Sequence, residues 1–511
     1  MSGTGQSLFD KLWQTHCIAD LGGGTHLLHI DRIFLHERTG GVALQSLAES
    51  GHTVRHPELA FCTIDHIVDT LPGRNDQTLM PGGEAFIRIT RQEALRSGMT
   101  LFDLGDPRQG IVHVVSPEQG IVLPGATVVC PDSHTCTQGA LGALAWGIGS
   151  SEAEHALATQ TLRVSKPKSI RVSFNGQLPQ GVGAKDMALA LIARFGAAGA
   201  KGAVVEFAGD AVSALGIEAR MTLCNMAVEF SAFTAVIAPD ASTLAYLKGR
   251  PFCPQGTHWD AAIEAWQSLN SDPDAHFDAE LSLDVSTLAP MVTWGTSPQH
   301  AVAVTDAVPV TDANPVIGPE PLRSAVQHTS RSTGDASAQQ AMHRALNYIG
   351  LTAGQMMAGV PISAAFIGSC TNSRLSDLRA AAAVLRGRHV APGVRAICVP
   401  GSSQVKLAAE AEGLHEVFKQ AGFEWRESGC SMCFFAGGES FGAQERVIST
   451  TNRNFESRQG PQTRTHLASP ITVAASALAG CIADPRPYLS GCIADPRPYL
   501  SGCKTRPNES A

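Results

Sequence analysis

The residues of this chain whose types and spacing most clearly indicate chemistry are three cysteines in two short segments. Gly-Ser-Cys-Thr-Asn-Ser-Arg at 368–374 contains Cys370, and Cys-Ser-Met-Cys at 430–433 supplies Cys430 and Cys433. Three thiolates are one short of a closed four-ligand metal site. They suit an iron–sulfur cluster in which one iron has no protein thiolate, because such an iron can bind substrate and act as a Lewis acid.

Two structural uses of these cysteines compete with the cluster. A single C-x-x-C pair also occurs in zinc knuckles and redox dithiols. A structural zinc site needs a fourth ligand, but the chain has no second C-x-x-C, and His52 and His56 lie far upstream of the cysteines. A redox dithiol lacks its usual thioredoxin-like context. The cysteines alone leave the cluster and these alternatives about equally supported.

Several histidines have carboxylates beside them in the sequence. His66 follows Asp65, and His134 stands two residues after Asp132. A carboxylate next to an imidazole can fix its tautomer and raise its pKa, which suits proton transfer. His113 stands alone in an apolar run, where a buried core histidine is the simpler interpretation.

Amides and guanidiniums complete the candidate set. Asn225 and Glu229 are one helical turn apart in an apolar setting and could face one pocket. Arg453 and Arg458 follow Asn452, and forked guanidiniums suit carboxylate ligands. Singly, each could form a surface or interdomain salt bridge. Together with an electrophilic iron and paired imidazoles, they indicate elimination and readdition of water on a hydroxy-di- or tricarboxylic acid.

Short apolar runs alternate with helical patterns and place these residues at strand ends. Alternation of this kind predicts an α/β protein with largely parallel sheets, in which ligands bind beyond the carboxyl ends of strands. A capping box at Ser151 and Glu154 predicts a helix to about Leu162. The predicted strands are 59–64, 110–115, 127–130 and 364–367, and the other predicted helices are 187–195 and 378–385.

Bulk composition excludes several classes of protein. The chain has 511 residues, 44% hydrophobic and 16% charged, enough for about three domains. A net charge of −8 and the absence of a basic stripe argue against nucleic acid as the main partner. The sequence shows neither a signal peptide nor a membrane-length apolar run, so we expect a cytoplasmic protein. The 13 scattered cysteines favour metal ligation over a disulfide framework.

The less regular segments suggest linkers and a tail. Segments 268–284, 304–321 and 334–340 are rich in small, polar or proline residues and are the candidate linkers. Near the carboxyl end, the sequence GCIADPRPYLS at 480–490 is repeated without change at 491–501. Two copies are too few for a solenoid. We therefore expect 481–511 to be a disordered, duplicated tail.

Taken in order, the motifs resemble those of the aconitase superfamily. They are DSHT at 132–135, GSCTNSR at 368–374, CSMC at 430–433 and NRNF at 452–455, together with PEQG, GIGSSEAEHALATQTL, KGRPF and TWGTSP. The similarity runs from about Leu8 to Asp484. Within the superfamily it is greatest to the branch that isomerises 2-isopropylmalate and 3-isopropylmalate in leucine biosynthesis.

The resemblance implies an aconitase-like three-domain α/β/α architecture around a central cluster site, with domains at 1–165, 166–295 and 296–480. It implies a 4Fe–4S cluster bound by Cys370, Cys430 and Cys433, with one iron not ligated by cysteine. It also implies two groups of pocket residues. The catalytic group is Asp65, His66, His113, Asp132, His134 and Glu229, and the substrate-binding group is Ser133, Asn225, Asn452, Arg453 and Arg458.

The superfamily's proton-abstracting serine lies in a Gly-Ser-Ser-Arg loop of a swivelling domain, and this chain has no such loop. Gly401-Ser402-Ser403-Gln404 ends in glutamine and is interpreted as a turn of the third domain. The resemblance therefore implies a heterodimer, in which a small swivel-domain subunit supplies the serine and a hydroxy-dicarboxylate is the substrate.

Departures from the family pattern leave the substrate open. Ser428, Ser457 and the pairs Phe230-Ser231 and Phe434-Phe435 stand where other residues are usual. A paralogue acting on 2-methylmalate or homocitrate is one alternative. The others are an RNA-binding aconitase-like regulator, against which the net charge argues, and a zinc-binding scaffold without catalytic activity.

Overall fold

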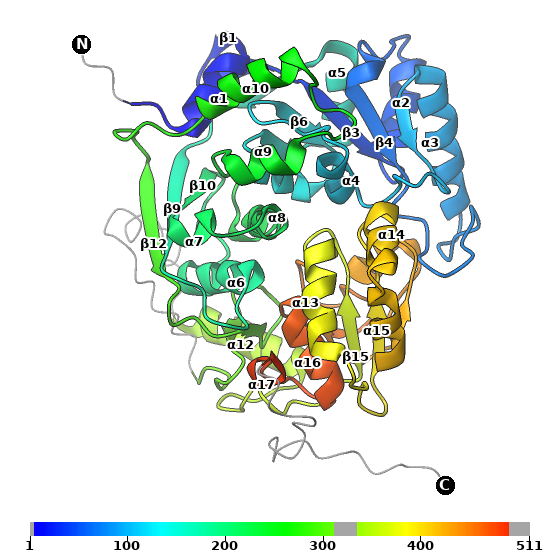
Figure 1. Ribbon diagram of the computed structural model, residues 1–511, viewed down its shortest axis with the longest axis vertical. Helices are drawn as coiled ribbons and strands as arrows, with labels where there is room; N and C mark the ends of the chain where they lie inside the picture. The colour runs from blue at the N-terminus through cyan, green and yellow to red at the C-terminus, as the bar shows by residue number, and fades with distance from the viewer. Residues whose placement is uncertain (1–4, 311–334, 490–511) are drawn as a thin grey trace.

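Three mainly parallel sheets form the framework of the protein. The computed structural model describes residues 5–310 and 335–489. Figure 1 shows one sheet beside α2 (Gly40–Glu49) and α3 (Gly83–Ser97) at the upper right, a second with β9 (Ser169–Asn175) and β12 (Ala279–Asp284) at the left, and a third around β15 (Ala364–Ile367) below. The predicted α/β class with parallel sheets is confirmed.

The first sheet has the strand order β5-β4-β3-β6-β7, with every pair parallel. Its central strands are runs of buried apolar residues, as expected for a parallel sheet that is covered on both faces. The strands are Thr100–Phe102, Ala60–Thr63, Arg32–His36, Thr127–Cys130 and Leu144–Gly147, and the helices are α2 (Gly40–Glu49), α3 (Gly83–Ser97), α4 (Val112–Glu118) and α5 (Ser150–Thr159).

The second sheet has the parallel order β11-β10-β9-β12. Two small antiparallel sheets, β1-β2-β8 and β13-β14, accompany it. The strands are Thr234–Val236, Val204–Ala208, Ser169–Asn175, Ala279–Asp284, Cys17–Gly22, Thr25–His29, Thr161–Ser165, Met291–Thr293 and Ala301–Ala303, and the helices are α1 (Leu8–His16), α6 (Ala184–Phe195), α7 (Asp210–Ser213), α8 (Ile217–Asn225), α9 (Ala241–Leu247) and α10 (Thr257–Gln267).

The third sheet has the parallel order β17-β16-β15-β18-β19. Alanine-rich helices α13 and α16 pack together beside β15 (Figure 1). The strands are Phe423–Trp425, Arg395–Cys398, Ala364–Ile367, Arg446–Ser449 and Arg464–Leu467, and the helices are α12 (Asp335–Ile349), α13 (Leu375–Leu385), α14 (Ser403–Ala411), α15 (Leu414–Ala421), α16 (Pro470–Ala479) and α17 (Arg486–Leu489).

One predicted strand is a helix. Residues 112–118 form α4, so His113 lies in the first turn of a helix rather than inside a strand. A short apolar run does not distinguish a strand from a buried helix by periodicity. The deciding contact is long-range, because the backbone N–H of Val112 donates to the Asp65 carboxylate at 2.9 Å. A carboxylate at a helix N-terminus is favourable.

The predicted capping box at Ser151 and Glu154 is also wrong. Gly149 is the N-cap of α5, and Glu152 accepts the hydrogen bond from the Gly149 N–H at 2.8 Å. Glu154 instead accepts from Ser46 of α2. The helix ends at Thr159, before the left-handed Gln160, and residues 161–165 form β8 rather than a continuation of the helix.

Two candidate linkers are parts of the fold. Residues 279–284 form β12, which pairs with β9, and α12 begins at Asp335. Residues 311–321 lie outside the described residues. We propose to keep the division at 1–165, 166–295 and 296–480, because each range contains one of the three parallel sheets. Every helix in the described ranges is too short or too polar to span a bilayer.

The expectation of a disordered tail is wrong for residues 481–489. Ile482 is fully buried, accepts from the Gly359 N–H at 2.9 Å and donates to the Val360 carbonyl at 2.8 Å. Tyr488 is 4% exposed and packs in the core of the third sheet. The first copy of the repeat therefore completes this core, whereas the second copy lies outside the described residues.

A chain that ends at Ala479 is expected to be less stable than one that ends at Ser490. Burial of Ile482 and Tyr488 contributes about 3 kcal/mol or more to the free energy of unfolding, from the apolar area that they remove from water. Thermal denaturation of the two shortened chains, with Ile482→Ala in the full chain as a control, measures the difference. Equal melting temperatures would contradict the packing role of the first copy.

Candidate functional site

A cavity of about 300 Å³ opens where carboxyl ends of strands from the first and third sheets face each other. Ten of the fourteen residues predicted from the sequence line it: His66, His113, Asp132, Ser133, His134, Cys370, Cys430, Cys433, Arg453 and Arg458. The other four do not line the cavity, but each is hydrogen-bonded to a residue that does; they are Asp65, Asn225, Glu229 and Asn452. The fold thus brings all fourteen into one region.

The three predicted cysteines are buried at the floor of this cavity. Cys370 follows β15, and Cys430 and Cys433 follow β17; they are 7%, 9% and 8% exposed. Burial raises the pKa of Cys370 to about 12, and burial raises that of Cys430 well above its usual range. Both thiols therefore stay protonated until a metal displaces the protons.

Hydrogen-bond donors surround the sulfur atoms. The Nδ2 of Asn225 lies 3.2 Å from the Cys370 sulfur, and the Nδ2 of Asn452 lies 3.5 Å from it. The Cys433 sulfur is 3.0 Å from the Ser369 hydroxyl and 3.7 Å from an Nη of Arg458. N–H and O–H groups aimed at sulfur stabilise thiolates and tune the potential of iron–sulfur clusters.

The backbone is strained next to the cysteines. Ser369 has φ +79° and Ser431 has φ +48°, both in the left-handed region that non-glycine residues rarely adopt. Strain of this kind costs of order 1–3 kcal/mol per residue and persists where the surroundings enforce it, most often at functional sites. Both segments therefore hold their cysteines in a fixed orientation.

This donor set fits a sulfide-bridged iron cluster. Soft thiolates select iron–sulfur clusters, zinc or copper(I), and a structural zinc would need a fourth ligand. Among the described residues, His66 lies near Cys430, but its ring nitrogens are bonded to Asp65 at 2.6 Å and Asp132 at 3.3 Å. Three buried thiols, two of which have N–H or O–H donors at the sulfur, match a cluster with an open iron better than a closed zinc site.

Asp132 connects the imidazoles opposite the thiols. It follows β6 and caps the next helical turn, because its Oδ1 accepts from the His134 N–H at 2.7 Å. The same oxygen lies 2.7 Å from the Nε2 of His113, and Oδ2 lies 3.3 Å from the Nε2 of His66. Burial opposes the charge, but the histidines hold the pKa of Asp132 well below its usual range.

Asp65 and His66 form a tight pair on the loop after β4. Their side chains are 2.6 Å apart, and Asp65 is fully buried. Burial would lower the pKa of His66, but the negative charge of Asp65 and the hydrogen bonds to Asp132 and Asp65 raise it well above its usual range. His66 is therefore a candidate proton donor.

Glu229 links the imidazole side of the cavity to the guanidiniums. Its Oε1 lies 3.0 Å from the Nε2 of His134 and accepts from the Nε of Arg453 at 2.8 Å. Burial raises the pKa of the Glu229 carboxyl, but these two partners lower it below its usual value. The pair fixes the orientation of Arg453, whose side chain is still 28% exposed towards the cavity.

Four lining residues were not found from the sequence. Ile111, Phe455, Arg38 and Phe434 complete the wall, and the ring of Phe434 lies between the guanidinium of Arg38 at 4.9 Å and that of Arg458 at 4.7 Å. Arg38 is the second residue after strand β3. Its position after that strand was the available signal, because the same rule located Asp65 and Asp132.

A buried lysine behind the site was also missed. Lys185 of α6 is 1% exposed, and its Nζ donates to the carbonyls of Thr450 and Thr451, directly before Asn452 and Arg453. Burial lowers the pKa of Lys185 to about 7. No local sequence signal marks this contact, since it joins elements of the second and third sheets.

The parallel sheets and the thiol-lined cavity define an α/β protein with a candidate iron–sulfur centre. A family model described as "Aconitase family (aconitate hydratase)" matches residues 10–480. The chain therefore belongs to the aconitase family, and membership implies a 4Fe–4S cluster, which the buried cysteines are suited to hold.

The chain also resembles individual proteins. It is 50% identical over 482 residues to the "3-isopropylmalate dehydratase large subunit 1" of Bradyrhizobium diazoefficiens, over 94% of this chain and 97% of that protein. The holo-form crystal structure of Thermococcus kodakaraensis aconitase X matches with a TM-score of 0.41 and 12% identity, over 84% of each chain. The second likeness is too weak to carry a conclusion.

Proposed function

We propose that this chain is the cluster-bearing large subunit of a hydro-lyase that isomerises 2-isopropylmalate and 3-isopropylmalate by dehydration and rehydration, a step of leucine biosynthesis in the cytoplasm. The observation that carries the proposal is the cavity, in which three thiols face carboxylate–imidazole pairs and guanidiniums. The name and the 50% identity of the Bradyrhizobium protein support the choice of substrate.

The thiols would bind the cluster, and the arginines would bind the substrate. Cys370, Cys430 and Cys433 would hold the cluster and leave one iron without a cysteine ligand. When bound, the cluster supplies an electrophilic iron that polarises the hydroxyl and a carboxylate of the substrate. Arg453 and Arg458, which line the cavity, would hold the remaining carboxylate charge.

The imidazoles would move protons. His66 lines the cavity and is kept protonated by Asp65 and Asp132, so it can donate a proton from its ring to the departing hydroxyl. Asp132 lies 2.7 Å from the Nε2 of His113 and 3.3 Å from that of His66, so its negative charge can stabilise the protonated ring of His66. Glu229 orients His134 and Arg453 on the other side of the cavity. Ser133, Asn225 and Asn452 would help to hold substrate and cluster.

A small swivel-domain subunit is proposed to supply the base serine. The Bradyrhizobium relative is called a large subunit, and the match spans 97% of it. The Gly-Ser-Ser segment at 401–403 serves a structural purpose, because Ser402 caps α14 and the Ser403 hydroxyl lies 3.0 Å from that of Ser428. This segment is not a substitute for a catalytic serine loop.

The proposed function is tested by anaerobic reconstitution of the cluster in this chain together with a small subunit. We expect dehydration of isopropylmalate to exceed that of 2-methylmalate and homocitrate measured side by side. A preference for either of the other acids would overturn the substrate assignment while leaving the hydro-lyase class in place. Salt-dependent RNA binding without hydro-lyase activity would overturn both.

Replacement of Arg453 by lysine is expected to raise KM by about tenfold and to lower kcat. The guanidinium of Arg453 donates to Glu229 and also faces the cavity, and the single ammonium of a lysine cannot do both. Steady-state kinetics measure the effect. Arg250→Lys is the control, because this arginine stacks on Tyr246 at 3.8 Å, outside the cavity lining. Equal kinetics for both variants would contradict a carboxylate-binding role.

A further inference from the structure

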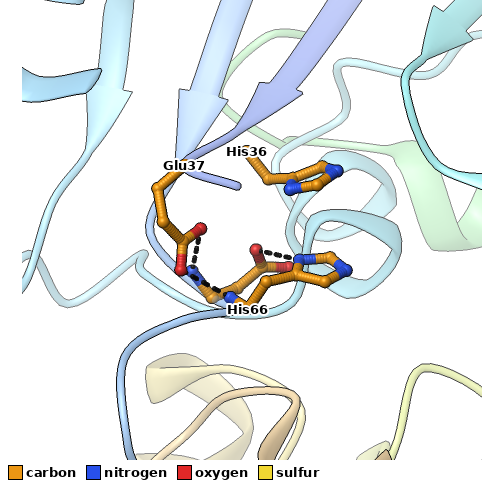
Figure 2. A group of neighbouring side chains, drawn as sticks. His36, Glu37 and His66 are labelled. Atoms are coloured by element: carbon orange, nitrogen blue, oxygen red, sulfur yellow. Dashed lines mark hydrogen bonds and ion pairs between the residues drawn. The ribbon is translucent and has the colours of Figure 1, made fainter. Parts of the chain in front are cut away.

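Glu37 is a fully buried carboxylate that no motif predicted, at the end of strand β3. Its Oε2 accepts from the backbone N–H of Asp65 at 2.9 Å. Its Oε1 accepts from the N–H groups of His66 at 2.7 Å, Ile67 at 2.5 Å and Val68 at 3.4 Å. Figure 2 shows the carboxylate turned towards the backbone of the His66 loop. Four consecutive amides thus converge on one side chain.

The same neighbourhood resembles a metal site, but its carboxylate oxygens already take part in hydrogen bonds. One ligand atom from each of His36, Glu37, Asp65 and His66 lies within 4.8 Å of the others. Both Glu37 oxygens are bonded to amides, and Asp65 Oδ1 is bonded to the Nδ1 of His66. The rings of His36 and His66 stack with centroids 4.0 Å apart (Figure 2). The arrangement is therefore a hydrogen-bonded support rather than a cation site.

The loop that Glu37 holds contacts three parts of the cavity. The Asp65 carboxylate binds His66 and also accepts from the N–H of Val112, which starts the helix that carries His113. The Asp65 carbonyl accepts from the N–H of Cys430 at 2.9 Å. A shift of this loop would therefore displace the His66 ring relative to both the other imidazoles and the thiols.

We propose that Glu37 is a positioning residue that fixes the Asp65–His66 pair for proton transfer. The proposal rests on the proposed function for the role of His66. A carboxylate is required because both of its oxygens accept N–H groups. A glutamine would keep one accepting oxygen and turn an NH₂ group towards the Asp65 N–H, so the loop would have to move.

The test compares Glu37→Gln with the control Glu206→Gln. Glu206 is a buried carboxylate of β10 that pairs with Ser271 and Arg171, outside the cavity lining. In the reconstituted complex, Glu37→Gln is expected to lower kcat at least about tenfold with KM within about threefold, because the arginines are untouched. Hydrogen exchange of the 64–69 segment is expected to become at least about tenfold faster.

The control separates positioning from general destabilisation. Glu206→Gln is expected to leave kcat and the exchange of segment 64–69 at wild-type values. The proposal is overturned if Glu37→Gln leaves the exchange of this segment unchanged, or if its kcat falls no more than that of Glu206→Gln. If Glu37→Gln does not fold, Glu37→Asp, which keeps the charge on a shorter side chain, is judged by the same criteria.

Failure of the proposed function would be seen separately. If the wild-type complex does not dehydrate any of the three hydroxy acids, the proposed function fails. Hydrogen exchange of the 64–69 segment and the NMR resonances of the His66 ring in Glu37→Gln then still decide whether Glu37 fixes the loop. An unchanged His66 resonance together with unchanged exchange would overturn the positioning role independently of activity.

Discussion

Cys370→Ser is expected to lose the visible absorbance of the cluster together with at least about 99% of the hydro-lyase activity. Loss of an outer hydrogen-bond partner of a metal ligand already costs about 10- to 100-fold, so loss of a ligand should cost more. Cys370 is buried in the loop after β15, and its sulfur accepts hydrogen bonds from the side-chain amides of Asn225 and Asn452. A serine hydroxyl has neither the softness nor the acidity of the thiol. Iron and acid-labile sulfide analysis measures the cluster directly.

The matched control is Cys398→Ser. Cys398 is a fully buried free thiol on β16, directly paired with β15, and it does not line the cavity. We expect this variant to keep its cluster and to lose only stability. A full complement of iron and sulfide in Cys370→Ser would refute the ligand assignment. Equal cluster loss in both variants would show that the effect comes from the fold of the third sheet.

Asp132→Asn is expected to lower kcat by about 10²- to 10⁴-fold with a smaller change in KM. The carboxylate of Asp132 serves two imidazoles and the backbone N–H of His134. An asparagine has only one accepting oxygen and no charge, so it cannot stabilise an imidazolium at His113 or His66. The arginines remain in place, so substrate binding should be largely preserved.

Asp31→Asn is the control for this second prediction. Asp31 forms a similar carboxylate–histidine pair, with its Oδ2 2.8 Å from the Nε2 of His16, but it lies outside the cavity lining. We expect it to retain wild-type kcat. If Asp132→Asn kept more than about a tenth of the wild-type kcat, Asp132 would not be part of the proton-moving set.

Residues directly after strands were the part of the site that the sequence could predict. Asp65, Asp132 and Cys370 each come shortly after a buried apolar run, and such runs were recognised at 59–64, 127–130 and 364–367. Neighbouring parallel strands bring the residues at their carboxyl ends to a common edge, so the order of elements predicts proximity without coordinates. The family resemblance then assigned roles that these positions alone left open.

Long-range contacts account for the features that the sequence did not predict. His113 lies on a helix because the α4 N-terminus meets the Asp65 carboxylate, a contact between residues 47 positions apart. Glu37 and Lys185 form hydrogen bonds with backbone groups of distant loops. Every residue type has such backbone groups, so neither composition nor periodicity indicates these contacts. The burial of the first copy of the repeat was not predicted, because it depends on contacts with distant residues and the sequence of the repeat does not indicate them.

The acid–base residues and the thiols come from different parts of the chain, and this has a consequence for biosynthesis. Asp65, His66 and Asp132 leave the ribosome long before Cys370 and Cys433, and β19, α16 and the buried Ile482 emerge later still. Since domains fold largely in the order of their synthesis, the third sheet should close last. We therefore expect iron to be inserted into a protein that is almost completely folded, in which Asp65, His66 and Asp132 are already in place.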